Sequence, residues 1–228
     1  MATSYGASPV QAPREDPLSY LPCSAVQQYR KGAVIYSRTH PSANLSLVID
    51  GKVKVSHLAG EGKEVVVDIY RADDFFGESA FLGIHHHAEE ARALENSKVM
   101  TWTVAEIEEI VSRQPRLAVA LLQVLAQRNV DLTERIESFS TDDISHRVAR
   151  TLVRLSERMG APEEGGRVRM GPLTHELLSQ YVGTSREVVT LHMNRFRRQG
   201  CVRYSRKNLV LDRGAFQEFL GLVPQQQL

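Results

Sequence analysis

The sequence is poor in cysteine and has no long hydrophobic stretch. Cys23 and Cys201 are the two cysteines among 228 residues. Their wide separation argues against a disulfide framework and suits a reducing cytoplasm, and two thiolates cannot supply the four ligands of an iron–sulfur cluster. The apolar runs fall far short of the roughly 20 residues that span a bilayer. We therefore predict a cytoplasmic protein that makes no use of a membrane.

The N-terminus also lacks the basic start and apolar core of a secretory signal peptide. Its content of proline, serine and alanine favours a flexible tail over residues 1–20, and the glutamine-rich end predicts a second tail over 224–228. A strong charge of either sign is absent too, because the formal net charge is +1. This balance does not exclude nucleic acid, because a DNA-binding domain needs a local basic face and not a basic chain.

Between Gly32 and Trp102 the apolar residues repeat with a period of two, which is typical of half-buried strands. Asp50-Gly51 is a strong two-residue hairpin signal, and the segment 60–63 predicts another turn. Short strands separated by regular turns favour a β-sandwich or jelly roll, which we assign to residues 21–114. The residues expected to alternate are Leu45, Leu47, Ile49, Val53, Val55, Val65, Val67 and Ile69.

After Pro115 the apolar period becomes that of a helix, and proline suits a first helical turn. We predict one long helix over residues 115–140 and a second from about Asp142 to Met159, followed by a surface loop over 161–166. An amphipathic helix usually packs within its own chain. The length of this one, and its position between two domains, favour instead pairing with a second copy. Its apolar stripe comprises Leu117, Leu121, Val124, Leu125, Leu132 and Ile136.

The stretch Leu173–Val202 predicts two short helices joined by a tight turn, within a DNA-binding domain over residues 141–223. Thr174 can cap the first helix with its hydroxyl, and Gly183 tolerates the positive φ of the corner. The second helix is expected to start with a Thr-x-x-Glu capping box over 184–187. Its polar front can enter the DNA major groove; the alternative is an ordinary helical hairpin. The buried back comprises Val189, Met193 and Phe196.

Basic residues gather after this turn and supply the local positive face that DNA requires. Between residues 186 and 207, the only acid is Glu187. The segments 202–205 and 209–211 predict a β-hairpin wing, whose tip carries Lys207. We expect this lysine to meet DNA phosphate.

The turn and the start of the second helix carry a family signature. Gly183-Thr184-Ser185-Arg186-Glu187-Val188-Val189 resembles the G-x-[ST]-R-E-[TV]-V signature of the CRP/FNR family of bacterial transcription regulators. Upstream, the segment 44–83 resembles the family's cyclic-nucleotide-binding-like β-roll, and Asp74-Phe75-Phe76-Gly77-Glu78 matches the start of its phosphate-binding cassette. The resemblance extends from about Tyr29 to the last helix. It implies an α+β protein with an N-terminal β-roll (jelly roll), a long dimerisation helix and a C-terminal winged helix-turn-helix domain.

The resemblance also implies how double-stranded DNA is bound. Ser185 should contact phosphate, while Arg186 and Glu187 should contact base edges, because Arg binds guanine O6/N7 and Glu accepts from cytosine N4. Many members have a further arginine where this sequence has Leu191, so we expect a half-site that differs from the family's TGTGA-like core. A homodimer should read a palindrome with half-sites one helical turn apart, about 34–36 Å. The candidate DNA contacts are Thr174, Ser185, Arg186, Glu187, Thr190, Leu191, Asn194 and Lys207.

The cassette departs from the cyclic-nucleotide pattern after its first residues. Binders continue with an Arg that clamps the cyclic phosphate, followed by Ser or Thr, and these positions fall at His87 and Ala88, beside Glu89. A carboxylate about 4 Å from the phosphate repels it by about 1 to 4 kcal/mol. The Thr-Ser pair that reads adenine is replaced by Leu132-Thr133. We therefore predict no cyclic AMP and no cofactor; the candidate effector residues are Gly77, Glu78, Ser79, His87, Ala88, Leu132 and Thr133.

The triple His85-His86-His87 resembles, together with Glu90, part of the metal motif of cupins. No further histidine follows in the β-rich half, so we predict a polar loop and no metal site, although one of these histidines could ligate haem. The segment 77–81 lacks the second glycine of G-x-S-x-G, which argues against a hydrolase. The competing classes are a cyclic-nucleotide-dependent regulator, a haem- or redox-sensing regulator, and a metal-dependent jelly-roll enzyme. An unknown small-molecule effector is a candidate partner of the regulator.

One further partner follows from the resemblance. In the family, a loop at the place of residues 161–166 can touch RNA polymerase, so the polymerase is a candidate partner beside DNA and a second copy of the chain.

Overall fold

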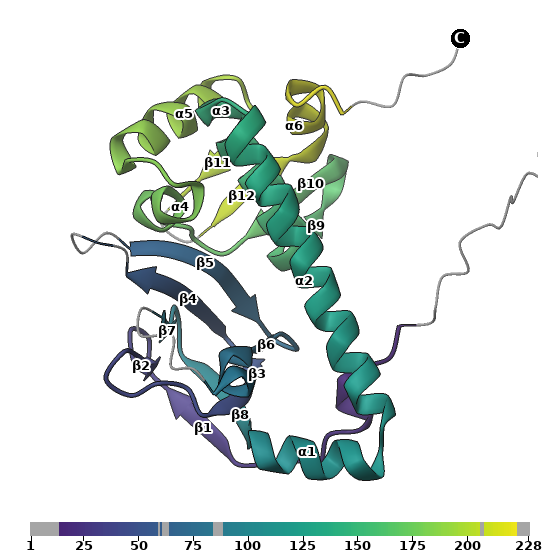
Figure 1. The fold of residues 1–228 in the computed structure, drawn as a ribbon. Coiled ribbons are helices and arrows are strands. Elements are labelled where there is room, and N and C mark those ends of the chain that lie inside the picture. The colour runs from purple at the N-terminus through teal and green to yellow at the C-terminus, as the bar shows by residue number, and fades with distance from the viewer. Residues whose placement is uncertain (1–13, 59, 61–63, 84–88, 206–207, 223–228) are drawn as a thin grey trace, which may run out of the picture.

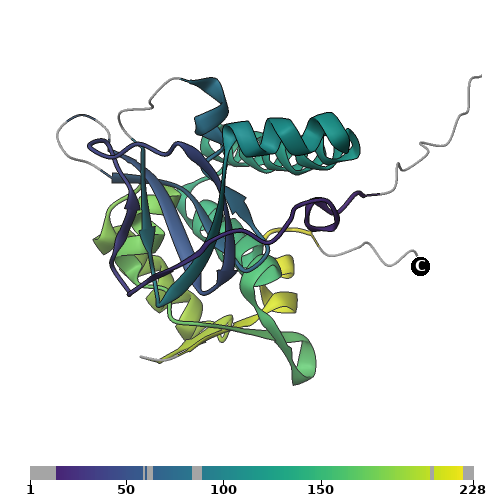
Figure 2. The same cartoon turned by 90° about the horizontal axis from the view of Figure 1, so that it is seen from below.

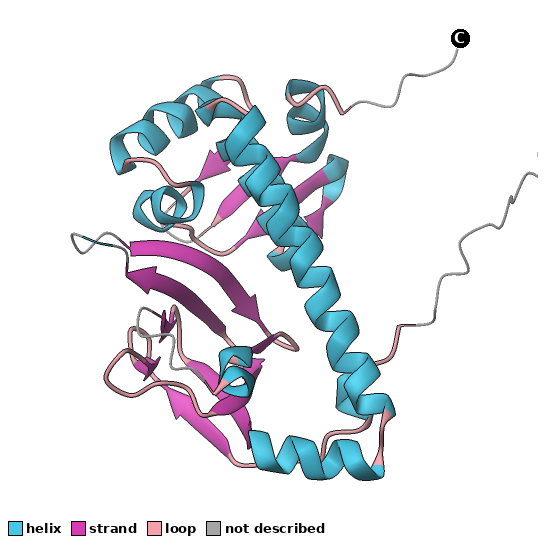
Figure 3. Ribbon diagram, in the orientation of Figure 1, coloured by secondary structure: helices cyan, strands magenta, loops and turns pink. Residues whose placement is uncertain are grey.

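The computed structural model describes residues 14–58, 60, 64–83, 89–205 and 208–222. Strands gather beside the lower part of one long helix, and a group of helices with a small sheet lies at its upper end (Figures 1 and 3). The described α-helices are α1 Val104–Arg113, α2 Arg116–Thr141, α3 Ile144–Met159, α4 His175–Val182, α5 Arg186–Arg198 and α6 Arg213–Phe219. The described strands and 3₁₀ helices are η1 Pro17–Ser19, β1 Val26–Tyr29, β2 Val34–Tyr36, β3 Asn44–Asp50, β4 Lys52–Leu58, β5 Glu64–Arg71, β6 Phe75–Phe76, η3 Glu78–Leu82, β7 Glu89–Ala93, β8 Ser97–Thr103, β9 Ala161–Glu163, η4 Glu164–Gly166, β10 Arg167–Met170, β11 Val202–Tyr204 and β12 Leu209–Asp212.

The N-terminal half is a β-roll of two four-stranded antiparallel sheets, in the orders β1-β8-β3-β6 and β2-β7-β4-β5. Side chains from both sheets share one apolar core. In it, the rings of Tyr36 and Tyr70 pack on Phe76 at centroid distances of 6.1 and 5.6 Å. Each large side chain buried in this way contributes about 1.5–3 kcal/mol relative to an exposed one. The predicted β-roll is confirmed.

Two β-bulges break the alternation expected from the sequence. On β3 the register with β8 shifts between Val48 and Asp50, so Ile49 is skipped and is 37% exposed, whereas Val48 is fully buried. The register of β5 with β4 also shifts, with Val67 skipped between Val66 and Asp68; Val66 is buried against the C-terminal helices, and Val65 is 36% exposed. A bulge adds one residue to one strand and moves the next side chains to the other face. The inward positions predicted for Ile49 and Val65 were therefore wrong.

The Asp50-Gly51 dipeptide is not a hairpin turn, because β3 and β4 belong to different sheets. It forms the corner at which the chain crosses from one sheet to the other. Gly51 has a φ of +86°, and a Cβ there would lie 2.5 Å from the Asn96 carbonyl oxygen and closer still to Ser97 Oγ. Glycine satisfies both the backbone angle and the close approach. The second predicted hairpin does pair β4 with β5, although its turn at 61–63 lies outside the described residues.

The helix α2 begins after Pro115 and runs for 26 residues, close to the predicted bounds. Its first turns pack through Leu117 and Ala120, which are fully buried. Farther along, Leu122 and Ile136 are each 64% exposed. Seen from below, α1 and α2 lie to one side of the strands (Figure 2). A long exposed apolar stripe marks an interaction surface.

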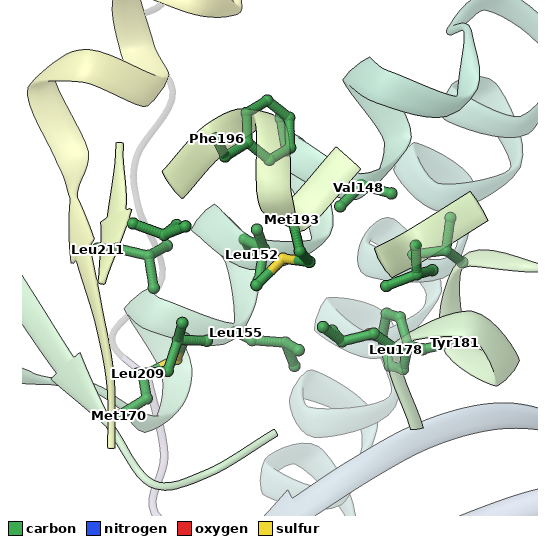
Figure 4. Packing of buried hydrophobic residues seen from close by; sticks show 14 of the residues in the cluster. Val148, Leu152, Leu155, Met170, Leu178, Tyr181, Met193, Phe196, Leu209 and Leu211 are labelled. Carbon is green, nitrogen blue, oxygen red and sulfur yellow. The ribbon is translucent and has the colours of Figure 1, made fainter. Parts of the chain in front are cut away.

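The C-terminal unit packs α3, α4, α5 and α6 around one core, together with a sheet in the order β11-β12-β10-β9. Figure 4 shows Leu152 and Leu155 of α3 among side chains from α4, α5 and the strands β10 and β12. The pairing of β11 with β12 has the form of the predicted wing. The surface loop predicted over 161–166 was wrong, because β9 pairs with β10 and η4 joins the two strands.

The strand β5 connects the two halves. Val66 and Ile69 contribute to the C-terminal core. Between them, Asp68 accepts two hydrogen bonds of 2.7 Å from Arg158 of α3 and lies 3.4 Å from the Tyr181 hydroxyl of α4. Burial works against the charge of Arg158, but the ion pair with Asp68 raises its pKa above the usual value. A shared apolar core and a largely buried ion pair therefore fix α3 and α4 against the β-roll.

Candidate DNA interface and effector cavity

Caps set the geometry of the helix-turn-helix. The Thr174 hydroxyl accepts from the Leu177 N–H at 3.1 Å and caps α4, as predicted. Gly183 ends α4 with a φ of +73°, which glycine adopts without strain. Ser185 then caps α5, with its hydroxyl accepting from the Val188 N–H at 3.3 Å. Each cap satisfies one of the free N–H groups at a helix start.

The capping box predicted over 184–187 does not form. The helix α5 begins at Arg186, and its cap is Ser185 and not Thr184. Glu187 is therefore the second helical residue. Its carboxylate accepts from its own N–H and from the Ser185 hydroxyl, and these hydrogen bonds lower its pKa. An ionised acceptor thus stands at the exposed start of α5.

The helix α5 has a buried back and an exposed front. Its predicted back is confirmed, because Val189, Met193 and Phe196 are at most 1% exposed. On the front, Leu191 is 67% exposed. The exposed Arg186 side chain makes no hydrogen bond or ion pair with any described residue. Its guanidinium is available to a base edge or a phosphate.

Thr190 and Asn194 are half-buried and engaged within the domain. The Thr190 hydroxyl donates to the Arg186 carbonyl at 2.8 Å and lies 2.8 Å from His175 Nδ1 on α4. Asn194 Oδ1 accepts from the Tyr204 hydroxyl of β11 at 3.0 Å. These two side chains tie α5 to α4 and to the wing, and their contacts with DNA stay predictions.

Exposed arginines extend the positive face from α5 to β11. The Arg197 guanidinium lies over the Tyr204 ring, 5.4 Å from its centroid, which holds it beside the wing. Cations on such a face neutralise DNA phosphates and release counterions. Lys207, predicted at the wing tip, lies outside the described residues. The exposed arginines are Arg186, Arg195, Arg197, Arg198 and Arg203.

A cavity of about 400 Å³ lies between the β-roll and α2. Its walls come from the strands, from η3 and from α2, and its volume falls in the range of small-molecule sites. Most of the lining side chains are apolar. They are Leu45, His57, Phe75, Glu78, Ser79, Phe81, Leu82, Glu89, Leu121, Val124, Leu125 and Arg128.

Among the predicted effector residues, Glu78 and Ser79 line this cavity. Gly77 lies just before them with a φ of +83°, and a Cβ there would meet the Asn44 carbonyl oxygen at 2.8 Å. The glycine is thus explained by the shape of the corner, with or without a ligand.

The other predicted effector residues are not brought to the cavity. Leu132 is 39% exposed on α2, and the Thr133 hydroxyl donates to the Asn129 carbonyl at 2.9 Å. Neither lines the cavity. His87 and Ala88 lie outside the described residues.

Arg128 is the one arginine or lysine among the described residues that line the cavity, and it is already engaged. Its guanidinium donates to the Glu78 carboxylate and, at 2.5 Å, to the Phe75 carbonyl. It also lies 4.9 Å from the centroid of the Tyr70 ring. The cation is therefore neutralised by its own protein and is not free to clamp a phosphate.

Glu89 is the second carboxylate at the cavity. It accepts a hydrogen bond from the Tyr36 hydroxyl, and His57 Nε2 lies 3.8 Å away. Burial, and secondly the negative charge of Glu89, raise the pKa of Tyr36 well above its ordinary value, so the phenol stays a neutral donor. A phosphate about 4 Å from this carboxylate would be repelled by about 1–4 kcal/mol. The described lining therefore fits a cyclic nucleotide poorly.

Among the described residues, no three His, Cys, Asp or Glu side chains lie close enough together to hold a metal ion. The triple His85-His86-His87 lies outside the described part of the chain. No helix in the described segments is long and apolar enough to cross a membrane.

Comparisons with known proteins agree with this geometry. The family model of the cyclic nucleotide-binding domain matches residues 26–114, and that of the Crp-like helix-turn-helix domain matches residues 146–219. The chain belongs to the CRP/FNR family of transcription regulators. In this CRP/FNR regulator, α4 and α5 therefore form the DNA-binding helix-turn-helix.

Known relatives cover most of the chain. The CRP-like cAMP-activated global transcriptional regulator of Mycobacterium tuberculosis is 27% identical over 80% of this chain and 82% of its own length. Transcriptional regulator SdrP of Thermus thermophilus is 31% identical over 68% of this chain and 73% of its own. A mutant of CooA from Carboxydothermus hydrogenoformans has a TM-score of 0.70 at 27% identity, over 86% of this chain and 87% of its own. The α+β fold and the family resemblance are confirmed.

Proposed function

We propose that this chain acts as a homodimer that binds a palindromic DNA site and regulates transcription without cyclic AMP. The observation that carries the proposal is the front of α5, where Arg186, Glu187 and Leu191 are exposed above a buried back. The N-terminal residues of a recognition helix are those that reach base edges in the major groove. Arg186 offers the fork that fits guanine, Glu187 an acceptor for cytosine, and Leu191 an apolar contact for a thymine methyl group.

Phosphate contacts complete the proposed interface. Thr174 and Ser185 stand at the N-termini of α4 and α5, where free N–H groups and hydroxyls meet the backbone of DNA. Thr190, Asn194 and Lys207 are the remaining proposed contacts. Phosphate contacts position the helix, whereas the base contacts select the sequence.

The exposed stripe of α2 supports the homodimer. Its members alternate at spacings of three and four residues, which is the a/d pattern of a two-stranded coiled coil. Asn129 occupies a single a position, where one polar residue fixes the register and number of strands at a cost in stability. Pairing along this seam would relate two copies of α5 by a two-fold axis, as a palindrome requires. The seam comprises Leu122, Leu125, Asn129, Leu132, Ile136 and Phe139.

The remaining partners are proposed by family resemblance. We propose RNA polymerase as the partner of the hairpin of β9, η4 and β10, whose tip at residues 164–166 is exposed. The cavity beside α2 is the proposed effector site, and its paired Arg128 and its carboxylates Glu78 and Glu89 support an effector other than cyclic AMP. We propose a cytoplasmic regulator that has no catalytic activity of its own.

The test is selection of bound sequences from random DNA by the full chain, with and without cyclic AMP. We expect one palindrome to be enriched equally in both arms. Enrichment that requires cyclic AMP would support the second candidate, a cyclic-AMP-dependent regulator, which the name of the Mycobacterium tuberculosis relative favours. Sequences without two-fold symmetry would contradict the dimer.

A further inference from the structure

We propose that the cavity between the β-roll and α2 binds a small apolar molecule that carries a protonated amine. The inference rests on the proposed function only in treating the β-roll as a sensor. It goes further by naming the chemical class of the ligand. The cavity lining has an apolar part and an electrostatic part.

The apolar part comes from side chains that converge on the cavity while exposed to water. Phe81 and Leu82 of η3 are 42% and 61% exposed, and Leu125 of α2 lines the same cavity. Leu45 and Phe75 supply buried apolar surface from β3 and β6. An apolar ligand gains free energy by removing such surface from water. Leu125 also belongs to the proposed dimer seam, so the cavity opens beside the contact between two copies.

The electrostatic part comes from the balance of charged groups. Glu78 and Arg128 pair with each other, which leaves Glu89 as the carboxylate without a cationic partner at hydrogen-bond distance among the described residues. Its neighbours are the neutral Tyr36 hydroxyl and, at 3.8 Å, His57 Nε2. A carboxylate can accept about four hydrogen bonds. An ammonium group, which has three donors and a positive charge, complements Glu89, whereas a carboxylate or phosphate does not.

Three probes with one carbon skeleton test the inference. Phenylbutylamine, phenylbutanol and phenylbutyrate differ only in the charge and hydrogen bonding of the head group. Binding to the full chain would be measured by calorimetry at neutral pH. Trp102 supplies a second readout by fluorescence, because it is the single tryptophan and its ring lies 6.4 Å from that of Phe75, which lines the cavity. We expect the amine to bind at least about tenfold more tightly than the carboxylate, with the alcohol between them.

Variants assign the preference to one side chain. Glu89→Gln keeps an oxygen for the Tyr36 hydroxyl but loses the charge. The affinity for the amine should therefore fall to that for the alcohol. Glu90→Gln is the matched control, because this neighbouring acid pairs with Arg92 and does not line the cavity. It should leave amine binding unchanged. Val124→Phe, on the α2 wall, should block all three probes and serves as a second test if Glu89→Gln fails to fold.

Several outcomes would overturn the inference. Tighter binding of the carboxylate or of cyclic AMP would reverse the assigned charge preference. Absence of binding by every probe would show that the cavity is not a ligand site. Equal losses of amine affinity in Glu89→Gln and Glu90→Gln would show that Glu89 does not set the preference. An enriched palindrome without amine binding would refute this inference alone, whereas amine binding that depends on Glu89, without any enriched DNA, would refute the proposed function alone.

Discussion

Replacing Arg186 by alanine should weaken binding to the selected palindrome and change binding to random DNA little. The side chain is exposed and has no hydrogen bond or ion pair with a described residue. Its removal leaves no cavity and no unsatisfied partner, so the free energy of unfolding should change by less than about 0.5 kcal/mol. A lost bidentate guanine contact costs about 1–3 kcal/mol. A dimer loses two such contacts, which gives about 2–6 kcal/mol, or at least about a 25-fold weaker complex.

Fluorescence anisotropy with a labelled palindrome and a scrambled duplex, at several salt concentrations, would measure both affinities. Arg186→Lys keeps the charge but loses the fork, so it should recover little of the specific binding. Arg198→Ala is the matched control, because this arginine is exposed at the other end of α5. It should weaken both duplexes by the same factor and reduce the salt slope by about two, because the dimer loses one phosphate contact in each copy.

Equal weakening of both duplexes by Arg186→Ala would refute the base-reading role and assign the side chain to phosphate. Full recovery by Arg186→Lys would lead to the same conclusion, because a point charge then suffices. A large loss of thermal stability would show that the side chain has a structural role, which its exposure argues against.

Three further predictions follow from the packing. Asn129→Leu should stabilise the dimer but relax its register, which sedimentation and cross-linking would detect as a tighter but mixed assembly; unchanged assembly would place Asn129 outside the seam. Asp68→Asn removes a charged partner of Arg158 and should lower the free energy of unfolding by about 1.5–3 kcal/mol in urea titrations; an unaltered midpoint would contradict the link between the two halves. Burial lowers the pKa of His192, and the nearby charge of Arg195 lowers it further. The stability that neutral His192 contributes is therefore present above about pH 6.5 and is lost as the pH falls through the folded-state pKa of this residue. His192→Gln should flatten this loss in unfolding midpoints measured below about pH 6.5, and an equal pH slope in both proteins would argue against it.

The order and type of the main elements could be predicted because they depend on local patterns, although helix α1 and the pairing of β9 with β10 were missed. The two-residue period of the β-roll and the 3.6-residue period of α2 and α5 lie in single stretches of chain. The positions of Ile49 and Val65 could not be predicted, because a bulge depends on the register with the neighbouring strand. The Asp50-Gly51 corner was mistaken for a hairpin for the same reason. The dipeptide specifies a turn, but the partners of the flanking strands are set by the whole β-roll.

In the candidate site, too, the features set by local spacing could be predicted, whereas those set by distant residues could not. The exposed front and buried back of α5 followed from helical spacing, whereas the choice of Ser185 over Thr184 as cap required the geometry of the turn. The cavity lining that sequence reasoning missed consists of residues far apart in the chain. Arg128 meets Glu78 across 50 positions, and neither has a neighbouring residue that signals the pair. The coiled-coil seam was a different kind of omission, because its heptad spacing, including Asn129, is visible in the sequence.

One helix connects the candidate cavity with the helix-turn-helix. Arg128 and Arg135 are seven residues apart on α2, so they project from nearly the same face, two turns apart. Arg128 holds Glu78 at the cavity, whereas Arg135 donates to the carbonyls of Val66 at 2.6 Å and Tyr181 at 2.7 Å and lies 4.1 Å from the Tyr181 ring centroid. A ligand in the cavity that displaced Arg128 from Glu78 would therefore act on the helix that also anchors α4. If α2 moves as one body, a rotation that breaks the contact of Arg128 with Glu78 must also strain the contacts of Arg135 with Val66 and Tyr181. The ligand therefore need not touch the DNA-binding unit.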